Sequence, residues 1–127
     1  MTEDQPDPRP RGAVTPDGPR LEGWRCTSCA RPFALESPWC PRCRGRLAPA
    51  TFGPEGVVWS ATVLRVPLPG RTPPTVLAYV DLDDGPRVLV HLRGRAHDER
   101  LPVGRRVRGV GLTASGDLMF EAVEQLA

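Results

Sequence analysis

Apolar and polar residues alternate along the second half of the chain in five short runs, each typical of a β-strand. The runs are GVVWSATVLRV (56–66), TVLAYVDL (75–82), RVLVHLR (87–93), RRVRGVGLT (105–113) and DLMFEAV (117–123). In the first run Val57, Trp59, Ala61 and Val63 face one way, and the intervening positions are also largely apolar. A strand that is apolar on both faces suits a small closed barrel, so this run predicts a long, curved first strand.

The connections between these runs predict how the strands pair. Asp83-Asp84-Gly85-Pro86 separates two alternating runs and predicts a β-hairpin. Residues 94–104 are too long for a hairpin turn, whereas residues 114–117 predict a second hairpin between the last two strands. A three-stranded meander, a crossover and a final hairpin match a five-stranded OB-fold barrel, which we assign to residues 51–127. Gly109 and Gly111 lie inside the fourth strand and predict strong bending or close approach of another backbone.

All four cysteines lie in one short stretch as two Cys-x-x-Cys pairs separated by ten residues: Cys26, Cys29, Cys40 and Cys43. Two such knuckles present four thiolates to one tetrahedral ion, and zinc is the favoured ion. The alternatives are a rubredoxin-like iron, two disulfides or a redox dithiol, but disulfides need an oxidising compartment, and the N-terminus has no basic start followed by an apolar stretch to export it. Because four cysteines leave no coordination position for water or substrate, we expect one structural Zn²⁺ per chain, in a zinc ribbon over residues 21–50.

The start of the chain is rich in proline. Residues 1–20 hold five prolines and almost no large apolar side chain, which predicts a disordered or extended leader.

Apolar run length and charge bear on localisation and partners. No apolar run approaches the length of a membrane span, so we expect a cytoplasmic protein that does not associate with membranes. The basic residues are seventeen arginines, but residues 51–127 carry nine arginines and nine acids. This balance argues against nucleic acid as the main partner.

The sequence offers no catalytic constellation. Its two histidines are His91, within a strand, and His97, in a charged loop, and we interpret both as ordinary surface or half-buried side chains. Asp81, Asp83 and Asp84 cluster at a turn, where aspartate stabilises the backbone, so we interpret them as turn formers and not as an acid/base pair. The protein is therefore not expected to be an enzyme.

Two sets of side chains are candidate binding surfaces. Arginines that flank the third and fourth strands could grip phosphates of coenzyme A or RNA: Arg93, Arg95, Arg100, Arg105, Arg106 and Arg108. The alternative is a solvated loop, because Asp98 and Glu99 lie among them. Large side chains of the ribbon and first strand could form a patch for a partner protein: Trp24, Trp39, Phe52 and Trp59.

Taken together, these motifs resemble a known family. A four-cysteine ribbon with CP-x-C as its second knuckle is followed by G-x-V-x-S-x-T-V from Gly56, by PP-x-x-x-A-x-V-x-L-DDGPR over 73–87, and by L-x-V-G-x-x-V over 101–107. This combination, over residues 22–124, is similar to the zinc-ribbon plus OB-fold acyl-CoA-associated proteins. Similar proteins usually start with a helical segment before the ribbon, where this chain has its leader, and they usually carry a glycine at the position of Arg44.

The resemblance implies a function. Members of that family are non-catalytic partners of thiolases, of hydroxymethylglutaryl-CoA synthase and of MaoC-type enoyl-CoA hydratases. It implies that this chain is an accessory subunit that binds a thiolase-like or MaoC-like enzyme and helps position the CoA moiety of a thioester. The alternative is a single-stranded nucleic-acid-binding module, since zinc ribbons and OB barrels both occur in such proteins. Exposed aromatic residues on the second and third strands would favour that alternative, but these strands offer only Tyr79.

Overall fold

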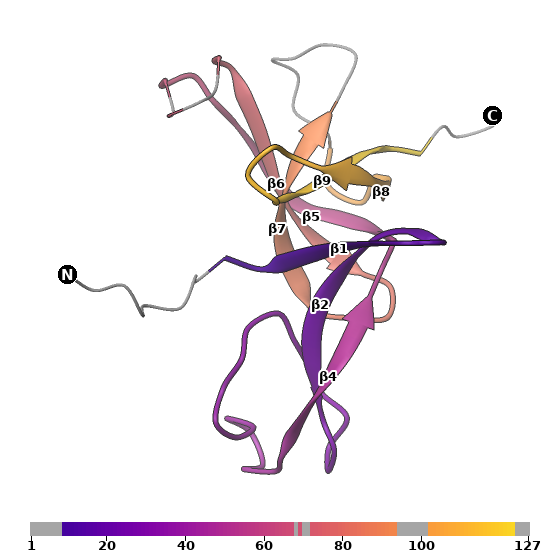
Figure 1. Ribbon diagram of the computed structural model, residues 1–127. Coiled ribbons are helices and arrows are strands. Elements are labelled where there is room, and N and C mark those ends of the chain that lie inside the picture. The colour runs from indigo at the N-terminus through magenta and orange to yellow at the C-terminus, as the bar shows by residue number, and fades with distance from the viewer. Residues whose placement is uncertain (1–8, 68, 70–71, 94–101, 124–127) are drawn as a thin grey trace.

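A computed structural model of the chain consists of two β-structures joined end to end (Figure 1). It describes residues 9–67, 69, 72–93 and 102–123. The first is a sheet of four strands: β1 (Arg11–Thr15), β2 (Gly18–Cys26), β3 (Pro32–Phe33) and β4 (Leu47–Phe52). The second is a closed barrel: β5 (Glu55–Leu64), β6 (Thr75–Leu82), β7 (Arg87–Arg93), β8 (Arg106–Leu112) and β9 (Leu118–Ala122). No helix occurs among the described residues, so the prediction of an all-β protein is confirmed.

The barrel has the predicted OB-fold topology. Its strands follow one another around the barrel in the order β5-β6-β7-β9-β8, and β8 closes the ring by pairing with β5. All pairs are antiparallel except β7 with β9, because the connection after β7 crosses over before the last hairpin forms. Inward side chains fill the interior, and Val80, Val107 and Phe120 are among those that are almost completely buried. A continuous apolar core thus fills the barrel.

The first barrel strand changes phase at Trp59. The register between β5 and β6 shifts between Val58 and Ser60, so Trp59 is the extra residue of a β-bulge. Before the bulge Val58 is buried in the core, and after it Ala61 and Val63 pack against the core. Strict alternation predicts that Trp59 shares a face with Ala61 and Val63. That part of the prediction is wrong, because the bulge moves Trp59 to the outer surface.

The predicted leader differs from the structure over residues 11–20. This segment contains β1 and the start of β2, which form an antiparallel hairpin with the register Thr15 to Gly18. The Thr15 hydroxyl donates a hydrogen bond to the Gly18 carbonyl at 2.7 Å and accepts one from the Asp17 amide at 3.3 Å. Pairing with β2, and of β2 with β4, gives this proline-rich segment the hydrogen bonds that an isolated leader would lack. Residues 1–8 of the predicted leader lie outside the described residues.

The four-stranded sheet contributes side chains to the barrel core. Leu21 of β2 and Phe52 of β4 are each 1% exposed and belong to the same apolar cluster as the barrel residues. Phe52 packs so close to Gly85 that a Cβ there would lie 2.6 Å from the phenylalanine side chain. Close approach also explains Gly109, where a Cβ would lie 2.9 Å from the ring of Pro19. The interpretation of Gly109 is thus confirmed.

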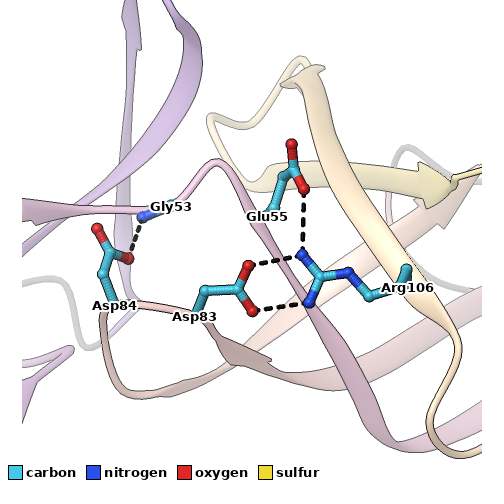
Figure 2. Close-up of polar contacts among 5 residues, drawn as sticks. All are labelled: Gly53, Glu55, Asp83, Asp84 and Arg106. Atoms are coloured by element: carbon cyan, nitrogen blue, oxygen red, sulfur yellow. Dashed lines mark hydrogen bonds and ion pairs between the residues drawn. The ribbon is translucent and has the colours of Figure 1, made fainter.

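Between the two β-structures the chain has almost no linker. The predicted boundary between residues 50 and 51 falls inside strand β4 (Leu47–Phe52), and β5 begins only three positions later, at Glu55. Polar contacts secure the junction (Figure 2): Asp84 Oδ1 accepts a hydrogen bond from the Gly53 amide at 2.9 Å, and Arg106 donates to both oxygens of Asp83 and to Glu55. In Figure 1 β2 and β4 extend from this junction toward the end that carries the cysteines.

Candidate metal centre and ligand-binding face

The two cysteine knuckles have matching backbone geometry. In the first, the Ala30 amide donates to the Cys26 carbonyl at 3.0 Å, and in the second the Arg44 amide donates to the Cys40 carbonyl at 2.8 Å. Ala30 and Arg44 each follow the second cysteine of a knuckle, and both have a φ of 66°. Each knuckle therefore turns through a left-handed residue directly after its second cysteine, a conformation that costs little only for glycine.

The four sulfur atoms converge on one point in space. Their Sγ atoms all lie within 4.8 Å of one another. Two of the distances join the two knuckles, with 3.4 Å from Cys26 to Cys43 and 3.8 Å from Cys29 to Cys40. Four thiolates at about 2.3 Å from a tetrahedral ion are about 3.8 Å apart, so this set fits a bound metal. The distances are too long for a disulfide, whose sulfurs are about 2.05 Å apart.

Backbone amides point at the sulfurs and favour thiolates. The amide of Cys29 donates to Cys26 Sγ at 3.4 Å, as does that of Ser28. These bonds, the Cys29 amide first, lower the pKa of Cys26 to about 6. The Gly45 amide acts in the same direction on Cys43, but the neighbouring sulfurs and burial outweigh it and raise the pKa of Cys43 to about 11. Four sulfurs this close repel one another as thiolates, and a divalent cation between them removes that repulsion.

The described members of the predicted arginine set mostly have partners within the chain. Arg106 binds Asp83 and Glu55, which raises the pKa of the arginine and lowers that of Asp83. Arg93 pairs with Glu121 at 3.1 Å. The guanidinium of Arg105 donates to the Val123 carbonyl, and Arg108 is exposed. Arg95 and Arg100 lie outside the described residues, as does His97.

The large apolar side chains predicted as a patch are separated in the structure. Phe52 is in the core and Trp24 is half-buried, whereas Trp39 and Trp59 are 57% and 48% exposed. Trp59 meets Tyr79 edge to face, with ring centroids 6.1 Å apart. The guanidinium of Arg87 stacks 3.8 Å from the centre of the Trp59 ring and binds Asp81.

Asp83 and Asp84 lie in the turn between β6 and β7, as predicted, and Asp81 lies within β6. The contacts of their side chains do not stabilise the turn itself, because Asp81 pairs with Arg87, Asp83 with Arg106, and Asp84 with the Gly53 amide.

A cavity of about 340 Å³ lies on the outside of the barrel beside His91. Its lining includes Leu77 of β6 and Leu89 of β7, together with Arg9, Asp117 and His91. His91 Nε2 is 3.4 Å from Asp117 Oδ2, and Arg9 donates to Asp117 Oδ1 at 3.1 Å. The sequence alone does not single out Arg9, Leu77, Leu89 or Asp117. The alternating pattern of the predicted hairpin could have indicated Leu77 and Leu89, because it places both apolar side chains on the outer face.

Comparison with known proteins supports the family resemblance. The family model of the ChsH2 C-terminal OB-fold domain matches residues 50–112. One solved structure is a chain of an "Ltp2-ChsH2(DUF35) aldolase", with 30% identity, a TM-score of 0.67, and coverage of 81% of this chain and 84% of that one. A DUF35 protein of unknown function from Sulfolobus solfataricus has a TM-score of 0.58 at 16% identity, covering 82% and 76% of the two chains, which supports the fold alone.

A curated relative matches a shorter stretch. The alpha subunit of 3-oxo-4,17-pregnadiene-20-carboxyl-CoA hydratase from Mycobacterium tuberculosis (strain ATCC 25618 / H37Rv) is 46% identical over 55 residues. The match spans 42% of this chain but only 17% of that subunit. The fold and the cysteine cluster define a zinc-ribbon-like sheet joined to an OB barrel. The chain belongs to the DUF35 family, which includes ChsH2.

The relatives correct one expectation. The prediction that the protein is not an enzyme is contradicted, because the relatives are named as a hydratase subunit and as an aldolase. These two relatives are therefore named as components of enzymes. In the part of the chain that the structure describes, no helix has the length and apolar character needed to cross a membrane.

Proposed function

We propose that this chain is a subunit of an acyl-CoA-processing enzyme, assembled with a thiolase-like or hydratase-type partner. The single observation that carries the proposal is the match with a chain of the Ltp2-ChsH2(DUF35) aldolase, since it covers more than four fifths of both chains at 30% identity. The hydratase alpha subunit adds a relative named for a CoA thioester. In such an assembly the barrel and the cysteine-bearing sheet offer two surfaces for contact.

We infer that the metal is a structural zinc ion held by Cys26, Cys29, Cys40 and Cys43. Support comes from the tetrahedral spacing of the sulfurs and from an all-thiolate ligand set, which leaves no position for substrate. The ion would supply positive charge between the thiolates and thereby hold the two knuckles together. A reducing compartment such as the cytoplasm fits this set, because all four thiols must stay unoxidised to bind. Metal analysis of the purified chain should give one zinc per chain, whereas iron would give a coloured protein.

Co-expression tests the assembly. The full chain is produced together with a candidate acyl-CoA aldolase, thiolase or hydratase, and the pair is purified by a tag on the candidate partner. We expect a stable complex in size-exclusion chromatography and a higher rate of acyl-CoA turnover than with the partner alone. Separate elution of the two proteins, with unchanged turnover, would contradict the proposal.

A nucleic-acid-binding module is the second candidate, and one observation favours it. The bulge places Trp59 beside Tyr79 on the outer face of the barrel, so this face carries two exposed aromatic rings. Stacking on aromatic rings is how OB folds bind single strands. However, Arg87, the arginine stacked on Trp59, is paired with Asp81. Salt-dependent binding of a short single-stranded oligonucleotide would support this candidate over the first.

A further inference from the structure

The four cysteines differ in their access to solvent. The first cysteine of each knuckle is buried, with Cys26 2% and Cys40 0% exposed, whereas the second cysteine of each knuckle, Cys29 or Cys43, is exposed. A dissolved oxidant therefore reaches one sulfur of each knuckle directly and not the other. Because a bound metal keeps all four sulfurs deprotonated, the two exposed sulfurs are nucleophiles in contact with solvent.

Each exposed sulfur lies beside a buried sulfur of the other knuckle. Cys43 Sγ is 3.4 Å from Cys26 Sγ, and Cys29 Sγ is 3.8 Å from Cys40 Sγ. An accessible cysteine with a second cysteine at its side is the arrangement found in redox-sensing thiol pairs. Two such pairs occur here, and each of them joins one knuckle to the other.

The two knuckles also approach each other through contacts other than their sulfurs. The Thr27 amide donates to the Arg46 carbonyl at 2.8 Å. Gly45 lies so close to the first knuckle that a Cβ there would be 2.7 Å from Ser28 Oγ and 3.0 Å from Cys26 Sγ. These contacts hold Cys26 near the second knuckle, within reach of a disulfide, whose sulfurs are about 2.05 Å apart.

We propose that the metal centre is a peroxide-sensitive switch, in which oxidation joins the knuckles crosswise, Cys26 to Cys43 and Cys29 to Cys40. Cys43 Sγ attacks one oxygen of hydrogen peroxide, the O–O bond breaks, and hydroxide leaves with the electron pair. Cys26 Sγ then attacks the sulfur of the resulting sulfenic acid, the S–S bond forms, the S–O bond breaks, and a second hydroxide leaves. The two sulfurs lose two electrons, the peroxide oxygens gain them, and two protons convert both hydroxides to water.

Crosswise disulfides preserve a link that disulfides within a knuckle would lose. A sulfur in a disulfide is no longer a thiolate ligand, so either set of bonds dismantles the metal site. In the cysteine-bearing tip, residues 26–46, the only buried side chains are those of Cys26 and Cys40, so no apolar core replaces the metal. Crosswise bonds therefore keep the oxidised tip closed without a metal. This inference rests on the metal site proposed above and is independent of the subunit role.

Peptide mapping of the zinc-loaded full chain tests which cysteines join. The chain is treated with hydrogen peroxide, its remaining thiols are alkylated, and it is unfolded without reductant and cut by a glutamate-specific protease. Cleavage after Glu36 separates the two knuckles in sequence. We expect the two fragments to stay joined until a thiol reductant is added. Separate fragments, each with an internal disulfide, would overturn the inference, as would sulfinic or sulfonic acids without any disulfide.

The matched control is the same chain, stripped of metal and oxidised in strong denaturant. Without the fold only separation along the chain decides the pairing, and the two cysteines of one knuckle, which are separated by two residues, should join to each other. The fragments should then separate after cleavage at Glu36. The same crosswise bonds in denaturant would show that the folded geometry does not direct them, and would overturn the inference.

Metal release and amide hydrogen exchange give a second readout. A chromophoric indicator should report the release of about one ion per chain as the disulfides form. This should occur at peroxide concentrations that leave the half-buried Met119 unoxidised. The oxidised, metal-free chain should keep the Thr27 amide protected, whereas chelation of the reduced chain should remove that protection. Loss of Thr27 protection on oxidation would overturn the inference.

The metal site and the switch fail in different ways. A chain that binds no metal would overturn the structural zinc and the switch together. A zinc-loaded chain that forms disulfides only within each knuckle would overturn the switch alone, and neither result bears on assembly with a partner enzyme.

Discussion

The sheet that carries the cysteines and the barrel are both all-β, but different forces hold them together. Between Trp24 and Ala50 the only buried side chains are Cys26 and Cys40. The barrel, by contrast, buries a cluster that includes Val58, Val80 and Phe120. The metal-ligand bonds must therefore replace a core in the knuckles, whereas the barrel is held by the hydrophobic effect. Two parts of one small protein thus respond to different perturbations.

Metal removal should separate the two parts most sharply. Structural zinc contributes on the order of 10 kcal/mol to zinc-finger folding, so a strong chelator should unfold residues 26–46 while the barrel stays folded. Amide hydrogen exchange measures this directly. Protection should be lost at Thr27 and Arg44 and retained at Val80 and Val90. Simultaneous loss of protection at Val80 would show that the barrel also depends on the metal, contrary to the comparison.

A core substitution should destabilise the barrel and not the metal-binding knuckles. Phe120→Ala removes a side chain that is 1% exposed in the barrel and should lower the free energy of unfolding by about 3–5 kcal/mol. Urea denaturation of the metal-loaded protein measures the change. Val103→Ala, at an exposed apolar position, is the control and should change stability by less than about 0.5 kcal/mol. If Phe120→Ala changed the free energy of unfolding only slightly, the apolar core would not be the main source of the barrel's stability.

Arg25 bridges the cysteine-bearing sheet and the barrel. Its guanidinium donates to the Ala30 carbonyl in the first knuckle at 2.7 Å and to the Asp84 carbonyl in the barrel turn at 2.9 Å, and it lies 5.1 Å from the centre of the Phe52 ring. Arg25→Met keeps an apolar stem and should cost about 1 kcal/mol. The sharper readout is coupling: in this variant, metal binding should raise the melting temperature of the barrel less than in the natural sequence. If metal binding raised the melting temperature by the same amount in Arg25→Met as in the natural sequence, Arg25 would not couple the two parts.

Acid should weaken the junction through Asp83. The hydrogen bonds from Arg106 lower the pKa of Asp83, so the folded carboxyl is more acidic than the unfolded one, which titrates near 3.8. The stabilisation is therefore present above pH 3.8 and is lost as the pH falls through the lowered value. Because Asp83 is half exposed, Asp83→Asn should cost less than about 1 kcal/mol at neutral pH. The difference between variant and natural protein in denaturation curves should vanish at low pH, and a constant difference would contradict the assignment.

The smallest expected effect lies in the second knuckle. Arg44 has a φ of 66°, which is unfavourable for a residue with a Cβ. Arg44→Gly should therefore stabilise the metal-loaded knuckle by about 0.5 kcal/mol, after allowance for the greater freedom of glycine in the unfolded chain. Competition with a chromophoric chelator measures this as tighter metal binding. Arg42→Gly, in the same knuckle but without a positive φ, is the matched control and should weaken binding or leave it unchanged.

Local patterns predicted most of the barrel and the cysteine cluster. Four cysteines at regular spacing and alternating strands around Asp83–Pro86 carry their structure in neighbouring residues. The β1–β2 hairpin had a local signal too, since Thr15-Pro16-Asp17-Gly18 is a turn sequence, but the surrounding prolines outweighed it in the interpretation. The position of Trp59 had none, because a bulge depends on the register of the paired strand. The polar side of the cavity had no signal either, since Arg9 and Asp117 are 108 residues apart and meet only through the fold.

Strand β2 has a practical consequence for anyone who wishes to recombine members of this family. It begins with Pro19 and Leu21 against the barrel and ends with Cys26 at the metal centre, so a single strand serves both halves. A shortened chain that starts at residue 50, where the family model begins, would leave the barrel without Leu21. Hybrids that exchange the cysteine-bearing tip should instead be joined within residues 23–25 on β2 and at the paired positions 48–50 on β4, so that the barrel keeps its own covering strand.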